Sequence, residues 1–267
     1  MAFLHTNGIR LSYRRSGQGK SVLLIMGSSA AAHVWDMYQT PALHQAGYQT
    51  VTFDNRGIPP SDAPPGKYSL ADLVADTRGL IEALNLAPCR IVGTSLGAAI
   101  AQELAINEPR LVHCAVLMAT RARSDVLRRA QDEADRVLQR SGVRLPPKCR
   151  AVDSVLKMLS PETHNDDDAV ANWLEIFELA GDDESATDGQ SWIDTGEDRR
   201  PALRKVTAPC RVIAFGDDLI SPPHLGAEVA DAIPNGDFVK IPGCGHLGHL
   251  ERPDAVNAAI IEFLDKF

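Results

Sequence analysis

The stretch Arg90-Ile91-Val92-Gly93-Thr94-Ser95-Leu96-Gly97-Ala98-Ala99 decides the fold of this chain. It begins with an apolar segment, residues 90–92, that predicts a buried strand, and residues 96–107 predict a helix. Between the two lies Gly93-Thr94-Ser95-Leu96-Gly97, a G-x-S-x-G pentapeptide. The pentapeptide alone is weak evidence, because ordinary glycine usage produces it by chance in about one in ten chains of this length. Its place between a strand and a helix predicts a nucleophile elbow, the tight turn that presents a reactive serine.

The glycines on either side of Ser95 have a mechanical purpose in such a turn. A serine there has strained backbone angles, and side chains at the flanking positions would collide with the neighbouring strand and helix. The small residues Ala98 and Ala99 follow where the start of the helix is crowded. The structural alternative is an ordinary Gly-Ser-Gly turn in which Ser95 caps the helix. Catalytic partners for the serine elsewhere in the chain separate the two interpretations.

Outside this stretch, short runs rich in Val, Ile and Leu alternate with amphipathic segments. This alternation is typical of βαβ units that build a mostly parallel sheet. The predicted strands are residues 9–13, 22–25, 49–53, 90–92, 112–118, 211–215 and 237–241. The predicted helices are residues 70–84, 96–107, 222–232 and 255–264.

The alternation stops between Thr120 and Thr207. This region has helical pieces and acidic clusters at 165–168 and 181–184, but no convincing strand. The pattern therefore predicts a helical cap inserted into an α/β core. The predicted boundaries are residues 121–206 for the cap and residues 1–120 with 207–267 for the core.

A cap above a sheet edge is expected to enclose a substrate cavity. The candidate pocket residues are Ser29, Met158, Trp173, Phe177 and His249. The alternative for the apolar cap residues among them is that they form the cap's own core.

A serine hydroxyl is a poor nucleophile until a base takes its proton, and histidine titrates near neutral pH. Among the eight histidines, His246 follows the strand predicted at 237–241, and a loop at that sheet edge can bring its ring over Ser95. His249 is the competitor. The spacing of the two histidines also resembles a metal-binding pair, but no cysteine or carboxylate cluster surrounds it, so we expect no metal site.

The imidazole of a catalytic histidine needs an acid to orient it and to stabilise its protonated form. The strand predicted at 211–215 is followed by Gly216-Asp217-Asp218. From the residues alone, either Asp217 or Asp218 fits this role. The chain order of serine, aspartate and histidine is the order of this type of site on an α/β sheet.

Several motifs together resemble the α/β-hydrolase superfamily in order and spacing, over nearly the whole chain. They are Gly27 through Trp35, Asp54-x-Arg56-Gly57, Gly93 through Gly97, Gly216-x-Asp218 and Gly245-His246. The chain looks most similar to the enol-lactonase, non-haem haloperoxidase and esterase branch. Its run at residues 56–62 resembles accessory hydrolases of bacterial natural-product pathways, including antibiotic biosynthesis.

This resemblance implies an α/β-hydrolase fold, with a mostly parallel eight-stranded sheet flanked by helices. It places the acid four residues before a proline, which selects Asp218 over Asp217. It also places the base in a Gly-His pair followed by Glu-x-Pro, and His246 with Glu251-Arg252-Pro253 matches that pattern. A serine at the elbow, rather than an aspartate, argues against haloalkane dehalogenases and epoxide hydrolases.

The negative charge that develops on an attacked carbonyl needs fixed hydrogen-bond donors. One donor is expected to be the backbone N–H of Leu96, the residue after the nucleophile. By resemblance, Ser28 supplies the other N–H. The chain departs from the family here, because Met26 stands where a histidine usually precedes the glycine. A second departure is Pro59-Pro60, where the related loop commonly has a glycine.

The composition of the chain excludes several classes of binding partner. A formal net charge of −8 argues against nucleic acid or an anionic membrane, because both require clustered Lys and Arg. No run approaches the apolar length of a membrane span, and five cysteines, an odd number, are typical of free thiols in a reducing cytoplasm. We expect a cytoplasmic enzyme that needs no cofactor and acts on a small molecule. Its assembly is left open, with a homodimer as one possibility.

The expected reaction is hydrolysis of an ester, lactone or thioester through Ser95, His246 and Asp218. Hydrolytic cleavage of a carbon–carbon bond needs the same three residues, so the sequence does not separate it from ester hydrolysis. A third alternative is a descendant of the fold that binds a ligand or catalyses a cyclisation or elimination.

Overall fold

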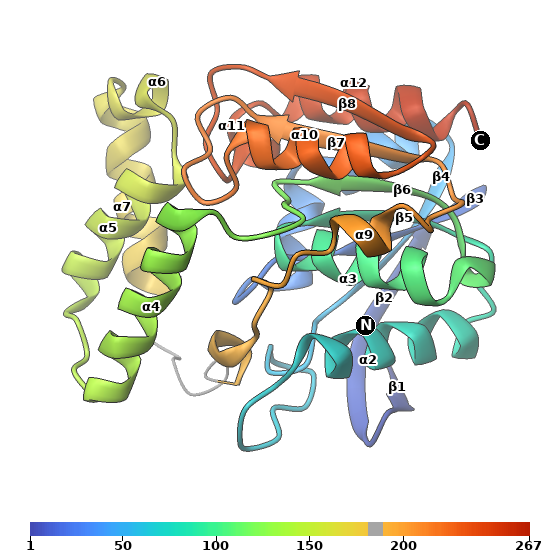
Figure 1. Cartoon of the computed structure of the whole chain (residues 1–267), viewed down its shortest axis with the longest axis horizontal. Helices are drawn as coiled ribbons and strands as arrows, with labels where there is room; N and C mark the ends of the chain where they lie inside the picture. Colours follow the sequence, from blue (N-terminus) through green and yellow to red (C-terminus); the bar gives the residue numbers. More distant parts are fainter. Residues whose placement is uncertain (181–188) are drawn as a thin grey trace.

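The structure is a computed structural model that describes residues 1–180 and 189–267. One sheet crosses the molecule in the strand order β1-β2-β4-β3-β5-β6-β7-β8 (Figure 1). The strands are β1 (Ala2–Thr6), β2 (Ile9–Gly17), β3 (Lys20–Ile25), β4 (Tyr48–Phe53), β5 (Cys89–Thr94), β6 (Val112–Met118), β7 (Cys210–Phe215) and β8 (Gly236–Ile241). Only the pairs β1–β2 and β2–β4 are antiparallel. The prediction of a mostly parallel eight-stranded sheet is confirmed.

Helices cover both faces of this sheet. The flanking segments are η1 (Ala32–Met37), α1 (Gln39–Gln45), α2 (Leu70–Ala83), α3 (Leu96–Asn107), η2 (Pro109–Leu111), α10 (Pro223–Ala232) and α12 (Pro253–Leu264). Residues of α2, α3 and α10 share one buried apolar cluster, and residues of η1, α1 and α12 share another. The sheet therefore separates two hydrophobic cores.

Strand β3 shows why the apolar runs of the sequence are continuous rather than alternating. Val22 and Leu24 belong to one buried cluster, and Leu23 and Ile25 belong to the other. Successive side chains of a strand point to opposite faces, so a strand covered on both sides needs an apolar residue at every position.

Helix α2 begins where its sequence provides a cap. The Ser69 hydroxyl accepts a hydrogen bond from the Asp72 N–H, and the Asp72 carboxylate accepts one from the Ser69 N–H. This reciprocal pair satisfies two backbone donors that the first turn leaves without partners inside the helix.

Between β6 and β7 the chain leaves the sheet. Among the described residues, four helices lie beyond its edge, at the left of Figure 1: α4 (Val126–Ser141), α5 (Pro147–Met158), α6 (Pro161–His164) and α7 (Asp167–Ala180). We call these the cap helices. The chain returns through η3 (Gln190–Trp192) and α9 (Arg200–Leu203), and the described residues between β6 and β7 include no strand. The division into a core and a cap of residues 121–206 stays a prediction, and the acidic cluster at 181–184 lies outside the described residues.

No helix in residues 1–180 or 189–267 is both long enough and apolar enough to cross a membrane.

Candidate active site

Ser95 stands on a strained turn between β5 and α3. Its backbone angles are φ 53° and ψ −116°, which a residue other than glycine rarely adopts. A Cβ on Gly93 would lie 2.4 Å from the Gly97 carbonyl oxygen, and one on Gly97 would lie 2.0 Å from the Ile25 carbonyl oxygen. The Ser95 side chain makes no cap hydrogen bond to α3, so the turn has the geometry of a nucleophile elbow rather than that of an ordinary helix cap.

The structure brings Ser95, His246 and Asp218 together at the carboxyl edge of the sheet. His246 follows β8, and its Nε2 lies 3.0 Å from Ser95 Oγ. The other ring nitrogen, Nδ1, lies 3.0 Å and 2.9 Å from the two carboxylate oxygens of Asp218. His246 is 5% exposed and Asp218 is 2% exposed, so their hydrogen bonds are shielded from water. The result is one continuous hydrogen-bonded chain from carboxylate to hydroxyl.

Asp218 is held as a charged group. Its Oδ1 accepts hydrogen bonds from the backbone N–H groups of Ile220 and Ser221, both at 2.8 Å. Burial by itself would raise the pKa of Asp218, but His246 and these two N–H groups bring that pKa below its ordinary value. The neighbouring Asp217 instead uses its backbone N–H to bind the Cys244 carbonyl oxygen, and its partly exposed carboxylate is not the one against His246.

A second charged group lies close to Asp218. The Arg121 guanidinium donates to Ser221 Oγ at 3.3 Å and to Thr195 Oγ1 at 2.9 Å. Burial lowers the pKa of Arg121, and Asp218 is among the carboxylates that counteract this effect. Arg121 forms no ion pair in the described part of the chain, so its charge adds to the field around Asp218.

Residues 26–29, which we call the oxyanion loop, pass beside the nucleophile. A Cβ on Gly27 would lie 3.3 Å from Ser95 Cβ. The two expected oxyanion donors are the backbone N–H groups of Ser28, in this loop, and of Leu96, the first residue of α3. Neither N–H donates a hydrogen bond to another group within residues 1–180 and 189–267. Both are therefore available to a ligand.

The oxyanion loop is supported from the segment after β4. Asn55 Nδ2 donates to the Met26 carbonyl oxygen at 3.1 Å, and Asp54 Oδ1 accepts from the Ala32 N–H at 2.8 Å, at the start of η1 just after the loop. Met26 itself is 2% exposed, so an apolar side chain fills the place of the family's usual histidine. Asn55 is a positioning residue that sequence reasoning missed, although it lies inside the Asp54-x-Arg56 motif.

A third support comes from η3, in the segment that leads from the cap helices back toward the core. Gln190 Oε1 accepts from the Ser29 N–H at 2.9 Å. Nothing in the sequence pointed to Gln190, because 161 positions separate it from Ser29.

The predicted pocket residues divide into two groups. Ser29 lies in the oxyanion loop, and the Met158 carbonyl oxygen accepts from the Leu247 N–H at 3.2 Å, beside His246. In contrast, Trp173 and Phe177 stack on each other in α7, with ring centroids 5.4 Å apart. Both rings are partly exposed, and among the described residues neither ring stacks on or hydrogen-bonds to Ser95, His246 or Asp218.

His249, the fifth predicted pocket residue, is buried in the core. It lies in α11 (Gly248–Glu251), is 2% exposed and contacts Trp35 with ring centroids 5.5 Å apart. Burial, with a smaller contribution from His246, lowers its pKa to about 3. An imidazole with so low a pKa is a weak base, and the His249 ring packs against Trp35 rather than Ser95, so it does not compete with His246.

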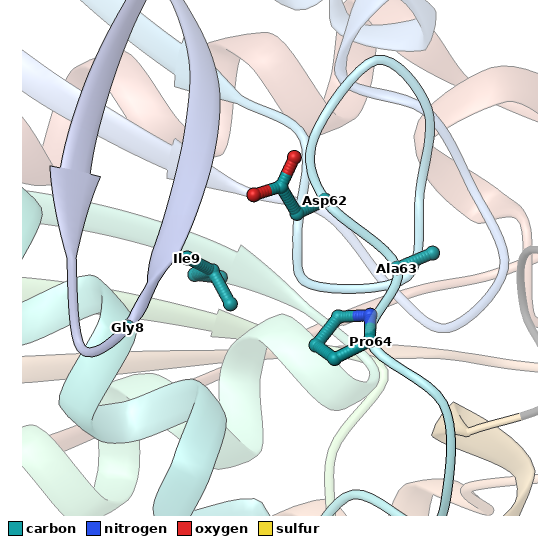
Figure 2. A pocket seen from close by; sticks show the side chains of 5 residues that line it. All are labelled: Gly8, Ile9, Asp62, Ala63 and Pro64. Atoms are coloured by element: carbon teal, nitrogen blue, oxygen red, sulfur yellow. The ribbon is translucent and has the colours of Figure 1, made fainter.

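A hollow of about 350 Å³ lies apart from these residues. Figure 2 shows its lining between the β1–β2 turn and the loop after β4: Gly8, Ile9, Asp62, Ala63 and Pro64. The Asp62 carboxylate there accepts from the Arg10 N–H at 2.9 Å. No residue of the candidate active site lines this hollow, so we assign it no part in the chemistry. Within the described residues, no group of three or more His, Cys, Asp or Glu side chains could hold a metal ion.

Comparison with known proteins agrees with this geometry. The model of the alpha/beta hydrolase family matches residues 22–259. A putative non-heme bromoperoxidase, BpoC of Mycobacterium tuberculosis, is 45% identical over 257 residues, covering 96% of this chain and 97% of that protein. Its crystal structure superposes with a TM-score of 0.92, at 44% identity and over 96% of both chains. A putative carbamate hydrolase, RutD of Azorhizobium caulinodans, is 26% identical over 98% of both chains. The chain belongs to the alpha/beta hydrolase family and is an enzyme.

Proposed function

We propose that this protein is a serine hydrolase that cleaves a small to medium-sized, apolar ester, lactone or thioester through an acyl-enzyme on Ser95. One observation carries the proposal: Ser95 Oγ, both nitrogens of His246 and the Asp218 carboxylate form one hydrogen-bonded chain beside two uncommitted backbone N–H groups. A pocket that only binds a ligand has no need for this combination of a strained serine, a base and an orienting acid.

In the first half of the reaction, Ser95 Oγ attacks the substrate carbonyl carbon while His246 Nε2 takes the hydroxyl proton. The Asp218 carboxylate stabilises the imidazolium through Nδ1. The carbonyl oxygen becomes an oxyanion and accepts hydrogen bonds from the Ser28 and Leu96 N–H groups. When the tetrahedral intermediate collapses, His246 protonates the leaving alcohol or thiol, and the acyl group stays on Ser95.

In the second half, water takes the place of the leaving group. His246 removes a proton from this water as its oxygen attacks the acyl carbon, and the same two N–H groups stabilise the second oxyanion. Collapse returns the proton to Ser95 Oγ and releases the carboxylic acid. The acid product therefore contains one oxygen atom from water.

The cap helices complete this proposal. We infer that residues 121–206 act as a lid that sets the size and apolarity of the substrate, because the end of α5 contacts the loop that carries His246. The resemblance to accessory hydrolases supports a place in a bacterial natural-product or catabolic pathway, with a small molecule as substrate. We further propose that the enzyme works in the cytoplasm.

One relative suggests a second candidate function. The protein that is 45% identical to this chain is named a putative non-heme bromoperoxidase. Hydrogen peroxide could replace water in the second half-reaction, which would release a peroxycarboxylic acid and free Ser95. This peracid oxidises bromide to hypobromous acid and is itself reduced to the carboxylate. Both candidates pass through the same acyl-enzyme and differ only in the molecule that attacks it.

The proposal is tested with a panel of simple esters, lactones and thioesters in ¹⁸O-labelled water. A hydrolase places heavy oxygen in the acid product, and Ser95→Ala abolishes that product. Bromination of a dye in acetate, peroxide and bromide tests the second candidate in parallel. Conversion of a substrate without ¹⁸O uptake, unchanged in Ser95→Ala, would establish a non-hydrolytic reaction instead.

A further inference from the structure

We propose that Gln190 is a positioning residue of the oxyanion hole, held in place by the segment that returns from the cap. We call residues 189–195 the strap, because they lead from the cap helices back toward the core. The inference rests on the proposed function, since it assigns a support to the N–H group of Ser28 that would stabilise the oxyanion.

Both ends of the Gln190 amide are bound. Oε1 accepts from the Ser29 N–H at 2.9 Å, and Nε2 donates to the Arg56 carbonyl oxygen at 2.7 Å. The amide cannot be reversed, because Ser29 offers only a donor there and Arg56 offers only an acceptor. The side chain is 3% exposed, so water does not readily replace either bond. Gln190 thus joins two loops that lie 161 and 134 positions away in the sequence.

These bonds act on the residue that follows the expected oxyanion donor. Ser29 has φ 58°, a conformation that a serine keeps only with support from its surroundings. On the C-terminal side of Ser28, Gln190 accepts from the Ser29 N–H. On the N-terminal side, Asn55 donates to the Met26 carbonyl oxygen. The Ser28 N–H lies between these two anchored peptide groups. Its direction is therefore set before a substrate binds, as electrostatic stabilisation of an oxyanion requires.

The strap is itself fastened to the core, so it presents Gln190 from a fixed position. The Gly189 carbonyl oxygen accepts from the Tyr68 N–H at 3.0 Å, and a Cβ on Gly189 would lie 2.4 Å from the Tyr68 ring. Lys67 Nζ lies 3.7 Å from the centre of the Trp192 ring. Within the described residues, no hydrogen bond joins Gln190 to the side chains of Ser95, His246 or Asp218. Gln190 can therefore influence the oxyanion hole without disturbing proton transfer.

Two substitutions test this role. Gln190→Met keeps the length of the side chain but removes both hydrogen bonds. Gln190→Glu keeps an acceptor for Ser29, but it loses the donor to Arg56 and places a negative charge near the site where an oxyanion forms. Gln139→Met is the matched control, because Gln139 Nε2 donates to Ser191 Oγ in the same strap and, among the described residues, forms no hydrogen bond to the oxyanion loop.

We expect the substitutions at Gln190 to weaken binding of the transition state more than binding of the substrate. With p-nitrophenyl butyrate, we expect Gln190→Met to lower kcat about 10- to 50-fold while KM changes less than about threefold, since losing a whole oxyanion donor costs roughly 100- to 1000-fold. The affinity for butylboronic acid, whose tetrahedral adduct on serine places an oxygen in the hole, should fall by a similar factor. Gln190→Glu should lose at least as much as Gln190→Met. Gln139→Met should stay within about twofold of the wild type in both measurements.

The possible outcomes separate this inference from the proposed function. If the wild type neither hydrolyses the ester nor binds the boronic acid, the proposed function fails and the inference fails with it. If the wild type does both but the Gln190 variants match Gln139→Met, the positioning role is wrong while the hydrolase stands. A third outcome would also contradict the positioning role: the Gln190 variants raise KM and lower the thermal stability, but bind butylboronic acid as tightly as the wild type. Gln190 would then only hold the strap to the core.

Discussion

Helices α3 and α4 have the same secondary structure but opposite environments. In α3, eight of twelve residues are buried, and Ser95 stands at its first turn. In α4, none of the sixteen residues is buried, and Val126 is 76% exposed. A close-packed helix holds an atom in place, whereas an exposed one can shift at little cost. The comparison indicates that close packing fixes the turn that carries Ser95, whereas no buried side chain of its own holds α4.

The two regions meet at the loop that carries His246. Glu251 Oε2 accepts from the Gly245 N–H at 2.6 Å, next to His246. Its Oε1 accepts from the N–H and hydroxyl of Ser160, at 2.9 Å and 2.8 Å, and from Thr163 Oγ1 at 2.6 Å. Ser160 and Thr163 belong to the junction of α5 and α6. The base is thus fastened to the cap as well as to the core.

The largest effect is expected in the core, at Ser95. Ser95→Ala removes the nucleophile and should lower kcat by roughly three to six orders of magnitude without a comparable loss of stability. Steady-state hydrolysis of p-nitrophenyl butyrate measures this change. Full activity of the variant on every accepted ester would move the nucleophile elsewhere.

The next largest effect separates two adjacent aspartates of the core. Asp218→Asn should cost on the order of 10⁴ in kcat, because it leaves His246 in the wrong tautomer. Asp217→Asn is the matched control and should be mild, since its carboxylate is not against the imidazole. Kinetics of both variants on one ester decide the question, and the reverse ranking would give the role to Asp217.

The buried core should also give the protein a pH-dependent stability through His249. Its pKa is about 3 in the folded chain, below the ordinary value of 6.5, so the unfolded chain binds a proton first on acidification. This contribution is complete above pH 6.5 and is lost as the pH falls toward 3, at roughly 1.4 kcal/mol per pH unit. His249→Phe should flatten the free energy of unfolding between pH 6.5 and 4.5, as measured by urea denaturation.

Because the pKa of Asp218 is lowered, the free energy of unfolding also decreases as the pH is lowered, but only below the ordinary aspartate value of 3.8. Other carboxylates also have shifted pKa values, such as Glu262, whose pKa Arg211 and Lys266 lower to about 2. Both proteins contain these carboxylates, so the difference between the wild type and His249→Phe from pH 6.5 to 4.5 reports His249. Equal pH slopes for the wild type and His249→Phe there would show that His249 is not held neutral by burial.

The junction between the regions should give an intermediate effect on catalysis. Glu251→Gln replaces one acceptor oxygen with an amide donor, which cannot accept from a backbone N–H, so either the Gly245 N–H or the Ser160 N–H loses its partner. We expect kcat to fall about tenfold as the His246 loop loosens. Glu162→Gln is the control, because Glu162 is exposed and pairs with Arg252 at the same junction. Equal rates for the two variants would show that the cap does not help to place the base.

The smallest effect is expected within the cap helices. Replacing both Trp173 and Phe177 by Ala should change the relative kcat/KM for short and long acyl esters by roughly threefold, with little change in stability. Replacing Ile176 and Leu179, which are exposed on the same helix, is the control. Identical acyl-length profiles for both double variants would leave Trp173 and Phe177 as packing residues of the cap.

The sequence predicted most of the core because its signals are local. The strand at 112–118 and the helix at 96–107 have the boundaries that the structure shows. Strand β1 was missed, since it is largely exposed and only Leu4 among its described residues packs against the apolar core. Its signal was the turn: Asn7 and Gly8 have positive φ, and an Asn-Gly pair favours a two-residue hairpin.

The candidate site could be predicted only where a motif marks it. Ser95, Asp218 and His246 each follow a strand, and the structure places their reactive atoms within 3.0 Å of one another in series. The hydrogen bonds of Gln190 join distant segments, which no local pattern encodes. Glu251 lies in the Glu-x-Pro pattern, but that pattern did not indicate its contacts with Ser160 and Thr163. His249 is the reverse case: the sequence suggested that it lines the pocket, but the structure packs its ring against Trp35 in the core.

The proposed mechanism requires Ser95 to carry the acyl group. A burst experiment mixes the enzyme with p-nitrophenyl acetate, follows p-nitrophenolate release on the millisecond scale and determines the intact mass after an acid quench. We expect a burst close to one equivalent per chain and a single acetyl group that maps to Ser95, with neither in Ser95→Ala. An acetyl group on another residue, or the same burst in Ser95→Ala, would contradict it.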